Sequence, residues 1–206
     1  MSGGGGTITT SGIAATVQAA HAAMAGLEQS LNAADALLGD GDTGGMLARV
    51  IGKMAEVDLS SAADPGAALM QLARAATLAT GSSLGTLLAT GLLAIGKRIK
   101  GQPDIEAGML SGLIAEARDA MMARGGASLG DKTVLDSLDA IAVALEGTMT
   151  TASAASTAAD AAREALDCYR EKPNRIGRAR MFGDKTIGYD DPGMLAVAEL
   201  AKAIRG

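Results

Sequence analysis

Apolar residues recur at helical spacing in eight segments of the chain, and polar or glycine-rich connections separate these segments. In the first segment Ile13, Val17, Ala20 and Met24 follow one another at intervals of three or four positions, which is typical of a helix with one buried face. No segment alternates apolar and polar residues in a way that convincingly predicts a strand. Helices are expected to begin near Ser11, at the glycine loop before Met46, after Asp64-Pro65, after Ser82-Ser83, at Pro103-Asp104, after Asp131-Lys132-Thr133, near Ser153 and after Asp191-Pro192.

The connections between these helices divide into two groups. Short connections favour antiparallel neighbours, so every second connection should lie at the same end of the fold. One end would then hold most of the glycine-rich, Asp-bearing and Arg-bearing loop sequence, in the connections 39–45, 80–83, 125–133 and 172–192. The other three connections resemble ordinary turns. We therefore predict an all-α, eight-helix antiparallel up-and-down barrel or bundle with a composite site at one end.

The composition limits the classes of function that need to be considered. Of the 206 residues 48% are hydrophobic, but there is no Trp, one Phe and eleven Met, so Ala, Leu, Ile, Val and Met must build the core. A net charge of −5 argues against a nucleic-acid partner. No apolar run is long enough for a membrane span, and the segment 1–6 does not resemble a signal peptide. With Cys168 as the only cysteine, a cytoplasmic location is expected.

Three carboxylates are crowded into the first of the site-end connections. Asp35, Asp40 and Asp42 fall within eight residues, among glycines and directly before an apolar helical pattern. Clustered carboxylates repel one another unless a cation lies among them, and oxygen ligands favour a hard ion such as Mg²⁺ or Ca²⁺. Because Mg²⁺ usually shares its coordination shell with phosphate oxygens, a phosphorylated ligand is expected. The simpler alternative is that Asp40 and Asp42 serve only as a helix cap and a turn residue.

Glycine-containing motifs for other ligands do not fit this connection. The spacing of glycines over 39–44 matches a dinucleotide-binding fingerprint, but that motif requires a preceding strand, and a helix is predicted here. An EF-hand loop counted from Asp40 would need Glu where Ile51 stands. No Walker phosphate loop is present. A carboxylate site for a metal remains the best interpretation.

The other site-end connections carry groups suited to phosphate. Ser82 and Ser83 stand where a helix begins, so their hydroxyls could bind phosphate or serve as a simple helix cap. Arg175, Arg178 and Arg180 bring positive charge to the last connection. Arginines in a long loop are more often solvated than functional, and these gain meaning only beside the other three connections.

Together the four connections resemble a known family. The motifs are Asp35-x4-Asp40-x-Asp42 within Gly-Asp-Gly-Asp-Thr-Gly, the segment 126–133 (Gly-Ala-Ser-Leu-Gly-Asp-Lys-Thr), Gly177-Arg178-Ala179, and the segment 183–193 ending in Asp191-Pro192-Gly193. In this order they are similar to the nucleotide-binding L subunit of dihydroxyacetone kinases (DhaL). The resemblance spans essentially the whole chain after the glycine-rich start.

The resemblance implies an eight-helix antiparallel barrel that binds ADP or ATP at one end through two Mg²⁺ ions. It also implies a single domain over 9–206 that follows a flexible lead-in at 1–8. The implied metal ligands are Asp35, Asp40 and Asp42. The implied nucleotide contacts are Thr43, Gly44, Gly45 and Met46 along the phosphates, Ser82 and Ser83 through their hydroxyls, Gly125 and Val134 at the adenine, and Arg178, Asp191, Pro192 and Gly193 from the last connection.

The resemblance also implies what lies outside this chain. In the family the ketone substrate is attached covalently to a histidine of a separate K subunit, so the K subunit is the expected partner. The phosphate would come either from a phosphotransferase-system protein that rephosphorylates bound ADP, or from exchanging ATP. No catalytic residue is therefore expected in this chain, whose only histidine, His21, lies outside the loops.

The chain departs from the family pattern at three places. Thr43 replaces the usual His, Met46-Leu47 replaces Asn-Met, and the segment 81–85 lacks the common Ser-Gly-Pro. The Thr is also similar to the nucleotide domain of bacterial fatty-acid kinases. Two alternatives thus stay open beside a ketose kinase subunit. They are a fatty-acid-kinase-like nucleotide domain and a non-enzymatic helical module that binds metal or nucleotide.

Overall fold

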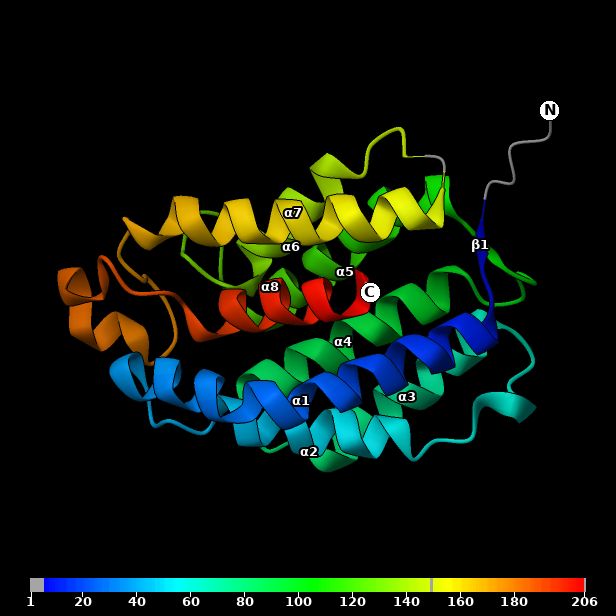
Figure 1. The fold of residues 1–206 in the computed structure, drawn as a ribbon, viewed down its shortest axis with the longest axis horizontal. Coiled ribbons are helices and arrows are strands. Elements are labelled where there is room, and N and C mark those ends of the chain that lie inside the picture. Colours follow the sequence, from blue (N-terminus) through cyan, green and yellow to red (C-terminus); the bar gives the residue numbers. More distant parts are fainter. Residues whose placement is uncertain (1–5, 149, 206) are drawn as a thin grey trace.

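The computed structural model describes residues 6–148 and 150–205, and these residues form an antiparallel helical barrel (Figure 1). Each helix packs against the next along the chain, and α1 packs against α8 to close the ring. The expected all-α, eight-helix arrangement is confirmed. The α-helices in the described residues are α1 (Thr10–Leu38), α2 (Thr43–Ala55), α3 (Pro65–Ala79), α4 (Ser83–Arg98), α5 (Leu110–Gly125), α6 (Val134–Ala144), α7 (Thr151–Arg170) and α8 (Pro192–Arg205).

Helices α3, α4 and α6 begin where the sequence places a cap. The side chain of Asp64 accepts a hydrogen bond from the backbone N–H of Ala67 at 2.8 Å, with Pro65 at the first helical position. Thr133 and Asp136 form a capping box at the start of α6. The cap of α1 is Thr9 instead of the expected Ser11, a shift within the usual uncertainty of helix ends.

The start of α5 differs from the prediction. Ile105–Glu106 forms strand β2, which pairs antiparallel with strand β1, Thr7–Ile8, and the short 3₁₀ helix η2 (Ala107–Met109) follows before α5. The side chain of Ile105 is 3% exposed, so an extended backbone here anchors the connection to the core. This two-stranded ladder was not expected from the sequence. It also pairs the last two residues of the expected flexible lead-in, whose residues 1–5 lie outside the described residues.

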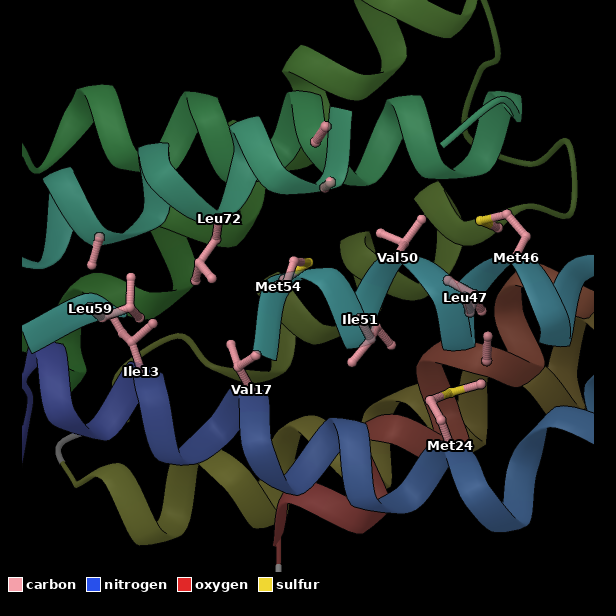
Figure 2. Packing of buried hydrophobic residues seen from close by; sticks show 14 of the residues in the cluster. Ile13, Val17, Met24, Met46, Leu47, Val50, Ile51, Met54, Leu59 and Leu72 are labelled. Atoms are coloured by element: carbon pink, nitrogen blue, oxygen red, sulfur yellow. The ribbon is translucent and has the colours of Figure 1, made fainter. Parts of the chain in front are cut away.

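Aliphatic and methionine side chains fill the barrel, as the composition predicts. In Figure 2 side chains of α1 and α2 converge with those of α3 and of the 3₁₀ helix η1 (Leu59–Ser61). A second cluster joins the Ala-rich α7 to α8, where Ala162 and Met194 are both fully buried. The small side chains of α7 let the two helices approach closely. Within the described residues, no helix combines the length and apolar content that a membrane crossing requires.

We predict that alanine at Gly66 disturbs the contact between α3 and α4. A Cβ atom there would lie 2.6 Å from the carbonyl oxygen of Gly96 and 2.7 Å from the Cα of Lys100. Because backbone atoms cannot move aside cheaply, Gly66→Ala should lower the free energy of unfolding by about 1–3 kcal/mol, as measured by urea denaturation. At exposed Gly112, where a Cβ meets nothing within 4 Å, alanine should stabilise by up to about 1 kcal/mol. Equal stability of the Gly66→Ala variant and the parent would contradict this packing.

Candidate functional site at one end of the barrel

One pocket of about 1160 Å³ collects the four connections that were expected at one end of the fold. The connections lie between α1 and α2, α3 and α4, α5 and α6, and α7 and α8, and the last one contains the 3₁₀ helix η3 (Ala179–Thr186). Most of the predicted site residues line the pocket, namely Asp35, Asp40, Asp42, Thr43, Met46, Ser82, Ser83, Gly125, Val134, Arg178, Asp191, Pro192 and Gly193. Gly44 and Gly45 do not line it.

The carboxylates of Asp35, Asp40 and Asp42 lie together at the junction of α1 and α2. One oxygen of each lies within 4.8 Å of one from the others. At such a separation two unit charges near a protein surface repel by roughly 3 kcal/mol. The arrangement is thus unfavourable without a cation, and its three oxygen donors match the preference of Mg²⁺.

Asp35 has a fixed orientation within this cluster. Its side chain is 8% exposed, and Oδ2 accepts hydrogen bonds from the backbone N–H groups of Asp42 at 2.9 Å and Thr43 at 3.2 Å. Both N–H groups lie at the beginning of α2, where the helix itself provides no carbonyl partner for them. A negative charge is also favourable at this end of a helix. Oδ2 is thereby committed to the turn, so Oδ1 is the less encumbered oxygen for a ligand.

Gly44 and Gly45 hold α2 against α1. A Cβ atom at Gly44 would lie 2.1 Å from the carbonyl oxygen of Glu28, so only glycine permits this approach. The N–H of Gly45 donates to Oδ1 of Asn32 at 3.1 Å. Their predicted contact with phosphates stays a prediction, while the structure gives Gly44 a packing role and Gly45 a backbone hydrogen bond to α1. Sequence reasoning missed Asn32, although it stands one helical turn before Asp35.

The second connection supplies a capped helix start. Oγ of Ser82 accepts from the N–H of Gly85 at 3.1 Å, so the N-cap interpretation of Ser82 is confirmed. The first residues of α4 line the pocket, and the N–H groups at a helix N-terminus favour anions. Beside them Arg49 of α2 donates through Nε to the carbonyl of Ala79 at 3.1 Å and also lines the pocket. Arg49 was not singled out from the sequence.

The last connection contributes positive charge. Arg178 forms an ion pair with Asp40 that joins the α7–α8 connection to the carboxylate cluster. Arg180 lines the pocket as well, whereas Arg175 does not. Of the three arginines noted in the sequence, Arg178 is therefore the one that meets the cluster directly.

Apolar side chains give another part of the pocket a different character. A Cβ atom at Gly125 would lie 3.2 Å from Cδ2 of Leu87, so glycine lets the side chain of Leu87 pack close to the backbone there. The pocket therefore combines an apolar region with a region that holds the carboxylate cluster and Arg178. The apolar lining residues near Gly125 are Leu84, Leu87, Met121, Val134 and Ile176.

Asp191 has an unusual environment at the beginning of α8. Oδ1 accepts from the N–H of Met194 at 3.0 Å, and Oδ2 accepts from Nδ2 of Asn174 at 2.9 Å. Burial raises the pKa of Asp191 to about 6, against the lowering effect of these hydrogen bonds and of Lys132 nearby. The carboxyl group therefore takes up a proton more readily in the folded chain than in the unfolded one.

The raised pKa of Asp191 predicts a pH dependence of folding stability. From about pH 4, where Asp titrates in unfolded chains, to about 6, the folded chain binds more protons at this position than the unfolded chain. Its contribution to stability therefore falls as the pH rises through this window. Asp191→Asn cannot titrate, so the stability of the parent relative to this variant should fall between pH 4 and 6 in urea denaturation. A constant or rising difference would contradict the assignment.

Comparisons with known proteins agree with this geometry. Residues 37–206 match the DAK2 domain family. The chain is 32% identical to the D-erythrulose kinase of Mycolicibacterium smegmatis over 201 residues, which cover 93% of this chain and 34% of the relative. It is 28% identical to the dihydroxyacetone kinase of Citrobacter freundii, again covering 93% of this chain and 34% of the relative.

A solved structure shows the same relationship. The crystal structure of the dihydroxyacetone kinase from C. freundii in complex with AMP-PNP and Mg²⁺ superposes with a TM-score of 0.71 at 26% identity. That match covers 94% of this chain and 33% of the other. The chain therefore spans about a third of the length of these relatives. The family match and the barrel geometry together identify the chain as a member of the DAK2 domain family, whose members include these relatives named erythrulose kinase and dihydroxyacetone kinase.

Proposed function

We propose that this chain is the nucleotide-binding part of a kinase for dihydroxyacetone or a related short ketose. It would hold ADP or ATP in the pocket through Mg²⁺ and pass phosphate to a ketose held covalently on a separate K-type subunit. The observation that carries the proposal is the meeting of Asp35, Asp40 and Asp42 in one pocket that also has an apolar part. Magnesium bridges carboxylates to phosphate oxygens in phosphoryl-transfer sites.

The residues present fit a bound divalent cation and a nucleotide. All three clustered side chains offer carboxylate oxygens, the donor type that Mg²⁺ selects. We propose two Mg²⁺ ions here, because three carboxylates and a polyphosphate offer more oxygens than one octahedral ion uses. Such ions would neutralise the charge of the phosphates during transfer. The C. freundii kinase was crystallised in complex with AMP-PNP and Mg²⁺, which supports this cofactor pair.

Asp35 and Arg178 of the pocket would then have positioning roles. Asp35 holds the turn before α2 through its two backbone hydrogen bonds, which keeps the neighbouring carboxylates aimed at the pocket. Arg178, already paired with Asp40, lies where it can contact a phosphate oxygen. The apolar side chains around Gly125 would receive the adenine. Positioning and charge neutralisation are the main tasks of a protein in phosphoryl transfer.

The proposed acceptor lies on another polypeptide. His21 is an exposed residue of α1 and does not line the pocket, so this chain offers no histidine there to carry a ketose. The relatives named erythrulose and dihydroxyacetone kinase are about three times as long as the matched part. In those relatives the matched part is about one third of a single longer chain, and for this chain we propose that a K-type subunit supplies the ketose site.

Removing one carboxylate should weaken nucleotide binding. Asp40→Asn and Asp42→Asn should each bind Mg²⁺·ADP at least about tenfold more weakly than the parent in calorimetry, because each loses a charged metal ligand. Glu146→Gln is the matched control, since it removes one charge from an exposed residue in the connection after α6, away from the pocket. Unchanged affinity in both Asp variants would rule out the metal-bridged site and favour a non-enzymatic module.

Activity should require the partner. Mixed with a K-type subunit, ATP or a phosphorylated phosphotransferase-system protein, and dihydroxyacetone or erythrulose, the chain should support formation of the ketose phosphate. Either component alone should not. Retention of ADP through dialysis would favour a bound cofactor that is rephosphorylated, and its loss would favour exchange with ATP. Ketose phosphate production by this chain without any K-type subunit would contradict the proposed division of labour.

A further inference from the structure

Lys132 is buried where the connections before α6 and before α8 meet. Its side chain is 0% exposed, and Nζ donates to the carbonyl oxygens of Arg170 at 3.2 Å, Lys172 at 2.8 Å and Thr186 at 3.0 Å. An ammonium group has three N–H donors, so these three contacts use all of them. The cation is satisfied by the backbone of one connection.

The three carbonyls come from both ends of the α7–α8 connection. Arg170 and Lys172 stand where α7 ends, and Thr186 ends η3. One ammonium therefore draws the beginning and the end of this connection together. A backbone hydrogen bond from Gly188 to the carbonyl of Arg170 at 2.9 Å closes the same loop. The segment that carries Arg178 lies between these two anchored ends.

A buried side chain extends the contacts from Lys132 to the pocket. Asn174 is 4% exposed, and its Nδ2 donates to the carbonyl of Lys132 at 3.0 Å and to Oδ2 of Asp191 at 2.9 Å. Its backbone N–H donates to Oγ1 of Thr186 at 2.8 Å. Asp191 lines the pocket, so a short series of hydrogen bonds joins the ammonium to the pocket wall.

Packing alone does not account for a lysine at this position. Burying a cation costs far more than burying a methionine of similar length, and burial lowers the pKa of Lys132 as expected from that cost. The backbone of Lys132 also has φ of 61°, a region that residues other than glycine adopt rarely. A buried cation and a positive φ are both unfavourable, and both occur at Lys132. This residue lies where the connections before α6 and before α8 meet.

We propose that Lys132 is a positioning residue that holds the connection 171–191 against the pocket, so that Arg178 meets Asp40 and Asp191 keeps its place in the pocket wall. The inference rests on the proposed function, because the ligand positioned in this way is the phosphate end of the bound nucleotide. Lys132 itself touches neither the metal cluster nor the ligand. It acts through the backbone that it holds.

The test replaces the ammonium by an uncharged side chain of similar length. In Lys132→Met, hydrogen exchange followed by mass spectrometry should show amides of 171–191 exchanging at least about tenfold faster, with α1 to α4 unchanged. Affinity for Mg²⁺·ADP should fall by about 10- to 100-fold, the usual cost of losing a supporting contact. Lys172→Met is the matched control, because its exposed side chain lies over the Tyr169 ring and only its carbonyl takes part in the contacts.

Each outcome of this experiment decides the proposal. Normal exchange over 171–191 in Lys132→Met overturns it, and so does faster exchange with unchanged affinity for Mg²⁺·ADP. If the variant does not fold, Lys132→Gly carries the same test, because it removes the ammonium at a position whose φ of 61° suits glycine. A parent chain that binds no Mg²⁺·ADP overturns the proposed function instead, and the exchange data then decide whether Lys132 anchors the connection.

Discussion

The mutual repulsion of three carboxylates is the constraint around which this end of the barrel is built. Asp35, Asp40 and Asp42 are brought together by the tight turn between α1 and α2, and the turn itself depends on hydrogen bonds accepted by Asp35. The cluster is stabilised from another connection, because Arg178 pairs with Asp40. The negative charge of the first connection is therefore partly balanced by positive charge from the last connection. A divalent cation bound among the three carboxylates would reduce their repulsion further.

Antiparallel packing gives the site its composite character. Because α1 also packs against α8, the barrel closes and its first and last connections become neighbours (Figure 1). The α1–α2 connection supplies the carboxylates, whereas the α7–α8 connection supplies Arg178 and Asp191. Neither connection forms the pocket alone. The buried contacts of Lys132 and Asn174 stabilise the longer connection without a ligand.

The fold could be predicted from the sequence because the signals for it are local. Periodic apolar residues and caps such as Asp64 and Thr133 mark the helices, and alternation of direction then places the carboxylates and arginines at one end. The start of α5 could not be predicted, because pairing of Ile105 with the distant Ile8 replaced the expected helix. This is a tertiary contact that local patterns do not report.

The site, like the fold, could be predicted only where its signals are local in the sequence. Crowded carboxylates and glycines are visible in the sequence, so the clustering of Asp35, Asp40 and Asp42 could be expected, while their role as metal ligands stays a prediction. The contacts of Asn32 and Lys132 could not be expected, because their partners lie far along the chain and no local pattern indicates them. Only the three-dimensional structure shows that Lys132 reaches backbone carbonyls more than thirty residues away.

Anomalous diffraction from crystals of the chain grown with Mn²⁺ and ADP would locate a metal ion at the three carboxylates directly. Mn²⁺ accepts the same oxygen ligands as Mg²⁺ and has a detectable anomalous signal. Anomalous density should lie among Asp35, Asp40 and Asp42, with metal–oxygen distances of about 2.1 Å, and the phosphates should share the metal. Density elsewhere, or ADP bound in the pocket without metal at these carboxylates, would contradict the account.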